Sequence, residues 1–94
     1  MEFENPNIVS IPVSCDGSAY QAEVGFNPRK VEVIQDGGYC ATAYKASTKA
    51  IKVTSSGTTF VSGLVSFDGE NKITLGTDAD LNVSGQVTTL LCYK

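Results

Sequence analysis

The stretch that decides the fold is Lys30-Val-Glu-Val-Ile-Gln35, then Asp36-Gly37-Gly38, then Tyr39-Cys-Ala-Thr-Ala-Tyr44. Both flanks alternate along the chain with a period of two, which is typical of β-strands that bury one face. The Asp-Gly-Gly sequence between them favours a tight turn, because aspartate and glycine accept the backbone angles that short hairpins require. The sequence therefore predicts an antiparallel hairpin near the middle of the chain.

Similar turn signals divide the rest of the chain, at Asp16-Gly17, Ser56-Gly57, Asp68-Gly69 and Ser84-Gly85. The segments between them predict further strands at residues 8–13, 20–24, 51–54, 58–61, 64–67, 72–75 and 87–93. We expect Asp16-Gly17 to join the first two strands in a hairpin. Pro12 indicates an edge strand or a bulge, since proline donates no ladder hydrogen bond. Phe60 and Phe67 fit core positions.

These patterns predict an all-β fold: a single small β-sandwich or barrel of about eight short antiparallel strands. We expect residues 1–7 to form an extended N-terminal arm and residues 8–94 to form the one β domain. The chain has 94 residues, 41% of them hydrophobic and 18% charged, with a net charge of -3. The sequence lacks the basic patch that is typical of nucleic-acid binding. The N-terminus lacks a signal-peptide pattern, and no apolar run is long enough for a membrane helix.

Catalytic machinery is not visible in the sequence. The chain has no histidine, which removes the commonest general base and most zinc sites. Cys15, Cys40 and Cys92 are odd in number and form no Cys-x-x-Cys pair, so we expect free thiols, although one disulfide stays open. The turn aspartates are better explained by hydrogen bonds to nearby backbone N–H groups. We predict no enzyme activity, no metal and no cofactor.

One segment resembles a calcium loop at its start. Asp78-Ala-Asp80-Leu-Asn82 has the spacing of the first EF-hand ligands, but the sixth position is Val83 and the twelfth is Thr89. Glycine and glutamate are required at those two places for the sharp turn and the bidentate ligand. A polar β-turn is the preferred interpretation.

Two groups of surface residues are candidates for binding. Tyr20, Tyr39 and Tyr44 would suit a sugar-binding or protein-binding face if they lay together, although cross-strand packing is the commoner role of such tyrosines. The stretch from Lys45 through Lys49 to Lys52 is basic, and it is more typical of a solvated face or a protected edge strand than of a nucleic-acid site.

Two stretches together resemble small β-rich virion proteins of tailed bacteriophages. Gly25-Phe-Asn-Pro-Arg-Lys-Val-Glu-Val-Ile34 resembles their opening segment. Ile73-Thr-Leu-Gly-Thr-Asp-Ala-Asp-Leu-Asn-Val-Ser-Gly-Gln-Val-Thr88 resembles the segment that closes the same domains before a last apolar strand. The resemblance covers most of residues 23–94, and this chain departs from it by having only Tyr93 as an aromatic residue in the last strand.

The resemblance implies a virion structural protein, made in the host cytoplasm and placed on the capsid surface. We expect a head decoration or cement protein that binds the major capsid protein and itself, as a homotrimer. The expected assembly contacts are Asn5, Ile8, Val9, Ile11, Val13, Lys49 and Lys52, because a free arm can add a strand to a neighbour. The alternative is a carbohydrate- or receptor-binding module of a tail or head fibre, with a glycan as its ligand. Neither nucleic acid nor a membrane is an expected partner.

Overall fold

The central hairpin forms as the sequence predicts. In the computed structural model, which describes residues 7–94, β3 (Lys30–Gln35) pairs antiparallel with β4 (Cys40–Tyr44) across a tight turn. Val31 and Val33 on β3 and Ala41 and Ala43 on β4 are buried on a common side of the sheet. The period-two pattern therefore sorts apolar side chains onto one face, as a half-buried strand pair requires.

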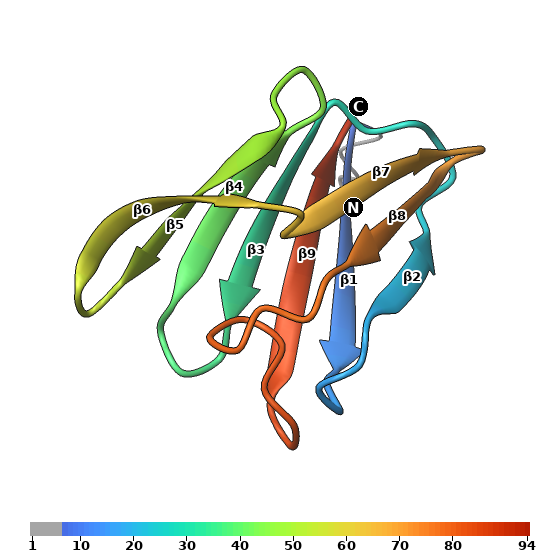
Figure 1. Cartoon of the computed structure of the whole chain (residues 1–94). Helices are drawn as coiled ribbons and strands as arrows, with labels where there is room; N and C mark the ends of the chain where they lie inside the picture. Colours follow the sequence, from blue (N-terminus) through green and yellow to red (C-terminus); the bar gives the residue numbers. More distant parts are fainter. Residues whose placement is uncertain (1–6) are drawn as a thin grey trace, which may run out of the picture.

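Nine strands form two antiparallel sheets in the described residues, which contain no helix (Figure 1). The larger sheet has six strands in the order β1 (Ile8–Ser14), β9 (Val87–Tyr93), β3, β4, β5 (Lys49–Thr54) and β6 (Gly57–Ser62). The smaller sheet has three strands in the order β2 (Tyr20–Glu23), β8 (Lys72–Leu75) and β7 (Val65–Gly69). The predicted all-β sandwich is confirmed. Residues 7–94 accordingly include no helical segment able to cross a membrane.

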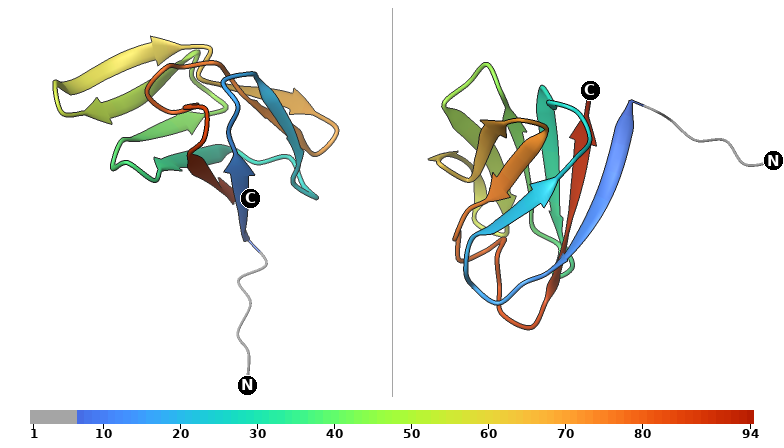
Figure 2. Two further views of the ribbon diagram at one scale, coloured as in Figure 1. Left: turned by 90° about the horizontal axis from the view of Figure 1, so that it is seen from below. Right: turned by 90° about the vertical axis from the view of Figure 1, so that its right-hand side faces the viewer.

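The hydrophobic core lies between the two sheets, which Figure 2 shows as separate layers. In Figure 1 the smaller sheet lies over the half of the larger sheet that contains β1, β9 and β3, and the β5–β6 hairpin extends away from it. The largest fully buried apolar side chains are Leu64, Ile73, Leu75, Leu81 and Leu90, with Val31, Val33 and Cys92. The β5–β6 end of the larger sheet is thus the part least covered by the second layer.

The predicted first hairpin is wrong. Strand β1 pairs with β9, and β2 pairs with β8 in the other sheet, so the Asp16-Gly17 turn passes between layers. The N–H of Cys15 donates to the carbonyl of Gln86 (2.9 Å), and the N–H of Gly85 donates to the carbonyl of Cys15 (3.0 Å). These bonds continue the β1–β9 ladder past the strand ends. The partner of a strand is set here by distant segments, while the local turn signal only marks where the chain bends.

The chain also changes sheets between β6 and β7, through Gly63 and Leu64. There the N–H of Gly76 donates to the carbonyl of Leu64 (2.9 Å). A Cβ atom at Gly76 would lie 2.6 Å from the carbonyl oxygen of Gly63, so only glycine permits this approach of two backbones. The close contact fixes the end of β8 against the crossover and closes the sandwich on this side.

Phe60 does not lie in the core as predicted. Its side chain is 69% exposed on β6, whereas Phe67 on β7 packs against the core. Strand β6 is an edge strand, and Phe60 stands on the side of the sheet that the smaller sheet does not cover. The predicted arm at residues 1–7, with the expected contact Asn5, lies outside the described residues except for Asn7.

Candidate functional site

The side of the six-stranded sheet that faces away from the smaller sheet, here named the outer face, carries most of the exposed large apolar side chains of the described residues. Side chains directly opposite each other on paired strands share a face, so register assigns each residue to a side. Among the described residues seven large hydrophobic side chains are exposed, and only Tyr20 belongs to the smaller sheet. The other six lie on the outer face: Ile34, Tyr44, Ile51, Val53, Phe60 and Val87.

Register places four of these six side chains in two adjoining rows, while Tyr44 and Val87 lie outside these rows. Ile34, Cys40 and Val53 lie opposite one another across β3, β4 and β5. Ile51 lies opposite Phe60 in the next row. An antiparallel sheet with one solvated face normally presents polar side chains to water. A contiguous apolar surface of this kind more often marks a place where a partner binds.

Strand β6 adds an open edge to this surface. Within residues 7–94 it pairs only with β5, so one row of its backbone groups has no strand partner. Natural edge strands usually carry charges or proline that prevent further pairing. Strand β1, at the opposite edge, contains Pro12, but the sequence Gly-Thr-Thr-Phe-Val-Ser of β6 contains neither a charge nor a proline. The β6 edge is therefore compatible with the addition of another strand.

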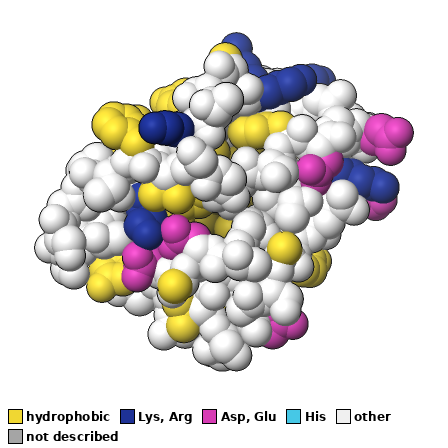
Figure 3. Space-filling view, in the orientation of Figure 1, with side chains coloured by type: hydrophobic (Ala, Val, Ile, Leu, Met, Phe, Trp, Pro, Cys, Tyr) yellow, Lys and Arg dark blue, Asp and Glu magenta, His cyan; other side chains and the backbone are white. Residues whose placement is uncertain are grey.

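A basic and aromatic hollow of about 750 Å³ lies at one end of the larger sheet, where β3 begins and where β4 and β9 end. Its lining residues are Arg29, Lys30, Tyr44, Lys45, Ala46 and Tyr93. Five of the seven lysines and arginines of the chain lie at this end: Arg29, Lys30, Lys45, Lys49 and Lys94. Figure 3 shows Lys and Arg side chains gathered along the upper end of the molecule.

The floor of the hollow is a row of side chains on β9, β3 and β4. Lys30 lies opposite both Tyr93 and Tyr44, and its ammonium is 4.6 Å from the Tyr93 ring centre and 5.9 Å from that of Tyr44. It also lies 3.9 Å from the Glu32 carboxylate. The Tyr93 hydroxyl donates a hydrogen bond to Glu32, and this bond raises the pKa of Tyr93. The Lys30 ammonium and the two tyrosine rings thus stabilise one another through cation–π interactions.

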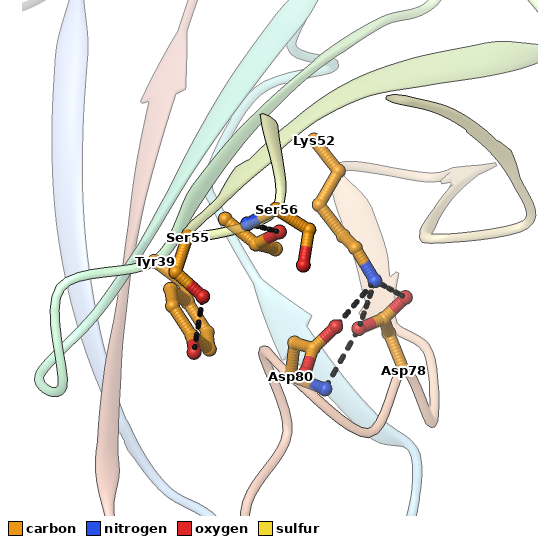
Figure 4. A network of polar contacts seen from close by, with 7 residues as sticks. Tyr39, Lys52, Ser55, Ser56, Asp78 and Asp80 are labelled. Carbon is orange, nitrogen blue, oxygen red and sulfur yellow. Dashed lines mark hydrogen bonds and ion pairs between the residues drawn. The ribbon is translucent and has the colours of Figure 1, made fainter. Parts of the chain in front are cut away.

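A second charged cluster lies on the inner side of β5 and is shown in Figure 4. The Lys52 ammonium lies 2.7 Å from Asp80 and 3.1 Å from Asp78, and the Lys52 and Asp78 side chains are only 14% and 11% exposed. Hydrogen bonds to Asp80 and then Asp78 raise the pKa of Lys52. The carboxylates of the calcium-like segment therefore neutralise a lysine of this chain. Among residues 7–94 no group of three His, Cys, Asp or Glu side chains is placed to hold a metal.

Asn82, the third polar residue of that segment, is a buried structural residue. Its amide group donates to the carbonyls of Ser18 (2.8 Å) and Gly76 (2.9 Å) and accepts from the N–H of Gly17 (3.2 Å). One side chain therefore ties together the loop after β1 and the loop after β8. This segment forms a turn, as predicted, and its polar residues form hydrogen bonds and ion pairs within the protein.

The three tyrosines predicted as a binding face do not lie together. Tyr20 is exposed on β2 in the smaller sheet. Tyr39 precedes β4, packs against the core and has its hydroxyl 3.4 Å from that of Ser55. Tyr44 lines the hollow with Tyr93, which the sequence did not single out. A sugar-binding face made of the predicted three is therefore wrong, because they belong to different surfaces.

The expected assembly residues also divide. Val13 is buried, Val9 and Ile11 pack against the core, and Lys52 is held by two carboxylates, so these four side chains are occupied within the chain. Val9 and Ile11 are only partly buried, so each keeps some exposed surface. Ile8, half-buried, and Lys49, exposed, remain available. Addition of a strand along β1 through its backbone stays a prediction.

The cysteines occupy two environments. All three are free thiols; Cys15 and Cys92 are buried, whereas Cys40 is half-buried on the outer face. Burial raises the pKa of Cys92 to about 11. The pairing of Cys40 with Ile34 and Val53 places its side chain on the opposite side of the sheet from Cys92.

No protein-family model, no curated protein and no solved structure matches this chain. The surfaces themselves are consequently the basis for an assignment of function. Of the residues that form these surfaces, the sequence had identified Tyr44, Lys45 and Lys49 as surface candidates. The sequence had not identified Ile34, Ile51, Val53 and Phe60. Strand β5 nevertheless offered a signal, because its one isoleucine and one valine alternate with alanine and lysine. One side of β5 therefore had to expose apolar side chains or bury a lysine.

Proposed function

We propose that this chain is a non-enzymatic structural module that docks onto a larger protein assembly through the outer face. The observation that carries the proposal is the placement of six of the seven exposed large hydrophobic side chains of the described residues on that face. Apolar surface in contact with water costs free energy, and a partner that covers it recovers that free energy. The uncharged edge at β6 lies beside the most exposed of these residues, Phe60.

The assembly that we propose is the head of a tailed bacteriophage. In this role the chain is a decoration protein on the capsid surface, in contact with the major capsid protein and with other copies of itself, as a trimer. The support is the sequence resemblance at residues 25–34 and 73–88. Those two stretches include most of β3 and β8 and the start of β9, and β3 and β9 are paired neighbours in the larger sheet.

A structural role also agrees with what the polar groups do. Asp78 and Asp80 form a close pair of carboxylates, and the ammonium of Lys52 engages both of them. Asp78 is largely buried, whereas Asp80 is partly exposed beside a small hollow of about 250 Å³. A general acid or base needs access to a substrate as well as a suitable pKa. The chain offers no histidine to replace them.

The proposal is tested by light scattering on a sizing column over a concentration series, and by sedimentation with purified tailed-phage heads. We expect a molar mass near three protomers of 9.9 kDa and binding to heads. Phe60→Ser and Ile51→Ser should weaken association by about tenfold or more, because each removes an apolar side chain from the interface. Tyr20→Ser is the matched control, since Tyr20 is exposed on the other sheet.

Two results would count against the proposal in different ways. Association that survives Phe60→Ser and Ile51→Ser but is lost in Tyr20→Ser would show that the outer face is not the docking surface. A chain that stays monomeric and remains in the supernatant with every head preparation would overturn the decoration role.

A further inference from the structure

We infer that the hollow between Arg29, Lys45 and the two tyrosines Tyr44 and Tyr93 binds an acidic sugar. The carboxylate of the sugar would lie between Arg29 and Lys45, and a face of its ring would stack on a tyrosine. The inference goes beyond docking, because the hollow lies at the end of the larger sheet and shares only Tyr44 with the six exposed apolar residues of the outer face.

Backbone hydrogen bonds hold the main chain of Arg29 next to that of Lys45. The N–H of Arg29 donates to the carbonyl of Tyr93 (2.9 Å), and the N–H of Lys45 donates to the carbonyl of Arg29 (2.9 Å). The N–H of Ser47 donates to the carbonyl of Tyr44 (3.0 Å) and closes the turn that carries Lys45. Two positive side chains therefore start from adjacent, fixed points on the rim of one concave surface.

These cations are not neutralised by the rest of the described chain. Within residues 7–94 neither Arg29 nor Lys45 forms an ion pair, whereas Lys52 has two carboxylate partners. The chain as a whole is acidic, with ten Asp and Glu residues against seven Lys and Arg. Unpaired cations that converge on a hollow in an acidic protein favour an anionic ligand over a neutral one.

The floor of the hollow is ordered without a ligand. Lys30 is held between the rings of Tyr93 and Tyr44 and beside Glu32, and the Tyr93 hydroxyl is hydrogen-bonded to Glu32. A surface that is already arranged loses less conformational entropy when a ligand binds. Tyr44 remains partly exposed, so its ring is accessible for stacking.

The shape and chemistry of the hollow favour a ring that carries a carboxylate. A volume of about 750 Å³ lies within the range of small-molecule sites and has room for one or two sugar units. The guanidinium group of Arg29 can bind a carboxylate through two parallel hydrogen bonds. The tyrosine rings offer apolar faces to the C–H side of a sugar ring.

The test is calorimetric titration of the full chain with trigalacturonate at low ionic strength. The neutral sugar of equal length is one comparison, and triglutamate, which has carboxylates but no rings, is another. Arg29→Gln and Lys45→Gln should each weaken binding by about tenfold, since each removes a charged hydrogen-bond donor. Lys72→Gln is the matched control, because it removes one positive charge from β8 in the other sheet and should change affinity by less than about twofold.

A second variant, Tyr44→Leu, keeps an apolar side chain and removes the ring. It should weaken the binding of trigalacturonate more than the binding of triglutamate. Equal binding of triglutamate and trigalacturonate would overturn the sugar assignment. Unchanged affinity in both Arg29→Gln and Lys45→Gln, or no binding at millimolar trigalacturonate, would overturn the site. Phe60→Ser should bind the sugar like the unaltered chain, so this inference and the docking proposal can fail separately.

Discussion

Strands β3 and β5 have the same length and belong to the same sheet, yet they use their two sides in opposite ways. Strand β3 turns Val31 and Val33 into the core. Strand β5 turns Ala50 and Lys52 inward and leaves its larger apolar side chains, Ile51 and Val53, on the outer face. The inner side of β5 meets two aspartates, and its outer side meets water. The comparison shows that β3 contributes its larger apolar side chains to the core of the domain, whereas β5 leaves its larger apolar side chains exposed. A partner on the outer face, as proposed above, would cover them.

The largest expected difference between the two strands is in their response to the same truncation. Val31→Ala should lower the free energy of unfolding by about 2 kcal/mol, because Val31 is 0% exposed and its lost methyl groups leave a cavity. Val53→Ala, at a residue that is 42% exposed, should change it by less than about 0.5 kcal/mol. Chemical denaturation at concentrations where the chain is monomeric measures both.

In an association assay the order of the two effects should be reversed. Val53→Ala should weaken self-association or docking, while Val31→Ala should leave the affinity of the folded fraction unchanged. If both variants destabilise the monomer equally, the outer side of β5 is packed in the free protein and the contrast between the strands fails.

The inner side of β5 can be tested at Lys52. Lys52→Met should lower the free energy of unfolding by about 1–2 kcal/mol at neutral pH, because Asp78 and Asp80 then lie close together without the cation that neutralises them. A variant that also carries Asp78→Asn and Asp80→Asn should recover part of this loss. An unchanged stability in Lys52→Met would mean that the cluster contributes nothing to the fold.

The pH dependence of stability has a definite sign at this cluster. Hydrogen bonds to Asp80 and Asp78 raise the pKa of Lys52 in the folded protein. The stabilisation is therefore complete below the unfolded lysine pKa of about 10.4 and is lost as pH rises through the folded pKa. Thermal melts from pH 7 to 11.5 should converge for the unaltered chain and Lys52→Met at the alkaline end. Both retain Cys92, whose raised pKa contributes a common alkaline loss.

Local patterns predicted the strands better than their partners. Alternation and the Asp-Gly-Gly turn were sufficient to predict the β3–β4 hairpin, because both strands and the turn that joins them lie within fifteen residues. The Asp16-Gly17 signal was equally clear, but β1 pairs with β9 through contacts more than seventy residues away. Alternation also cannot say which of two sides is inside. Phe60 was therefore assigned to the core, since only the position of β6 at an uncovered edge exposes it.

The smallest effect that separates the two sides of the sheet is the reactivity of its thiols. Cys40 lies on the outer face between Ile34 and Val53, whereas Cys92 is buried on the inner side of β9, where its pKa of about 11 keeps it protonated. Because the thiolate is the reactive form, Cys40 should react with a maleimide in the native monomer, and Cys92 should react only when the chain unfolds.

Docking or self-association should then slow the labelling of Cys40 several-fold, since a partner on the outer face covers the row in which it lies. The rate is measured by mass spectrometry across the same concentration series as the molar mass. In Phe60→Ser, whose association is weakened, the labelling of Cys40 should stay fast at concentrations where Cys40 of the unaltered chain is protected from the maleimide. If Cys40 reacts at one rate in monomer and oligomer alike, the copies meet through another surface, and the apolar side of β5 needs a different explanation.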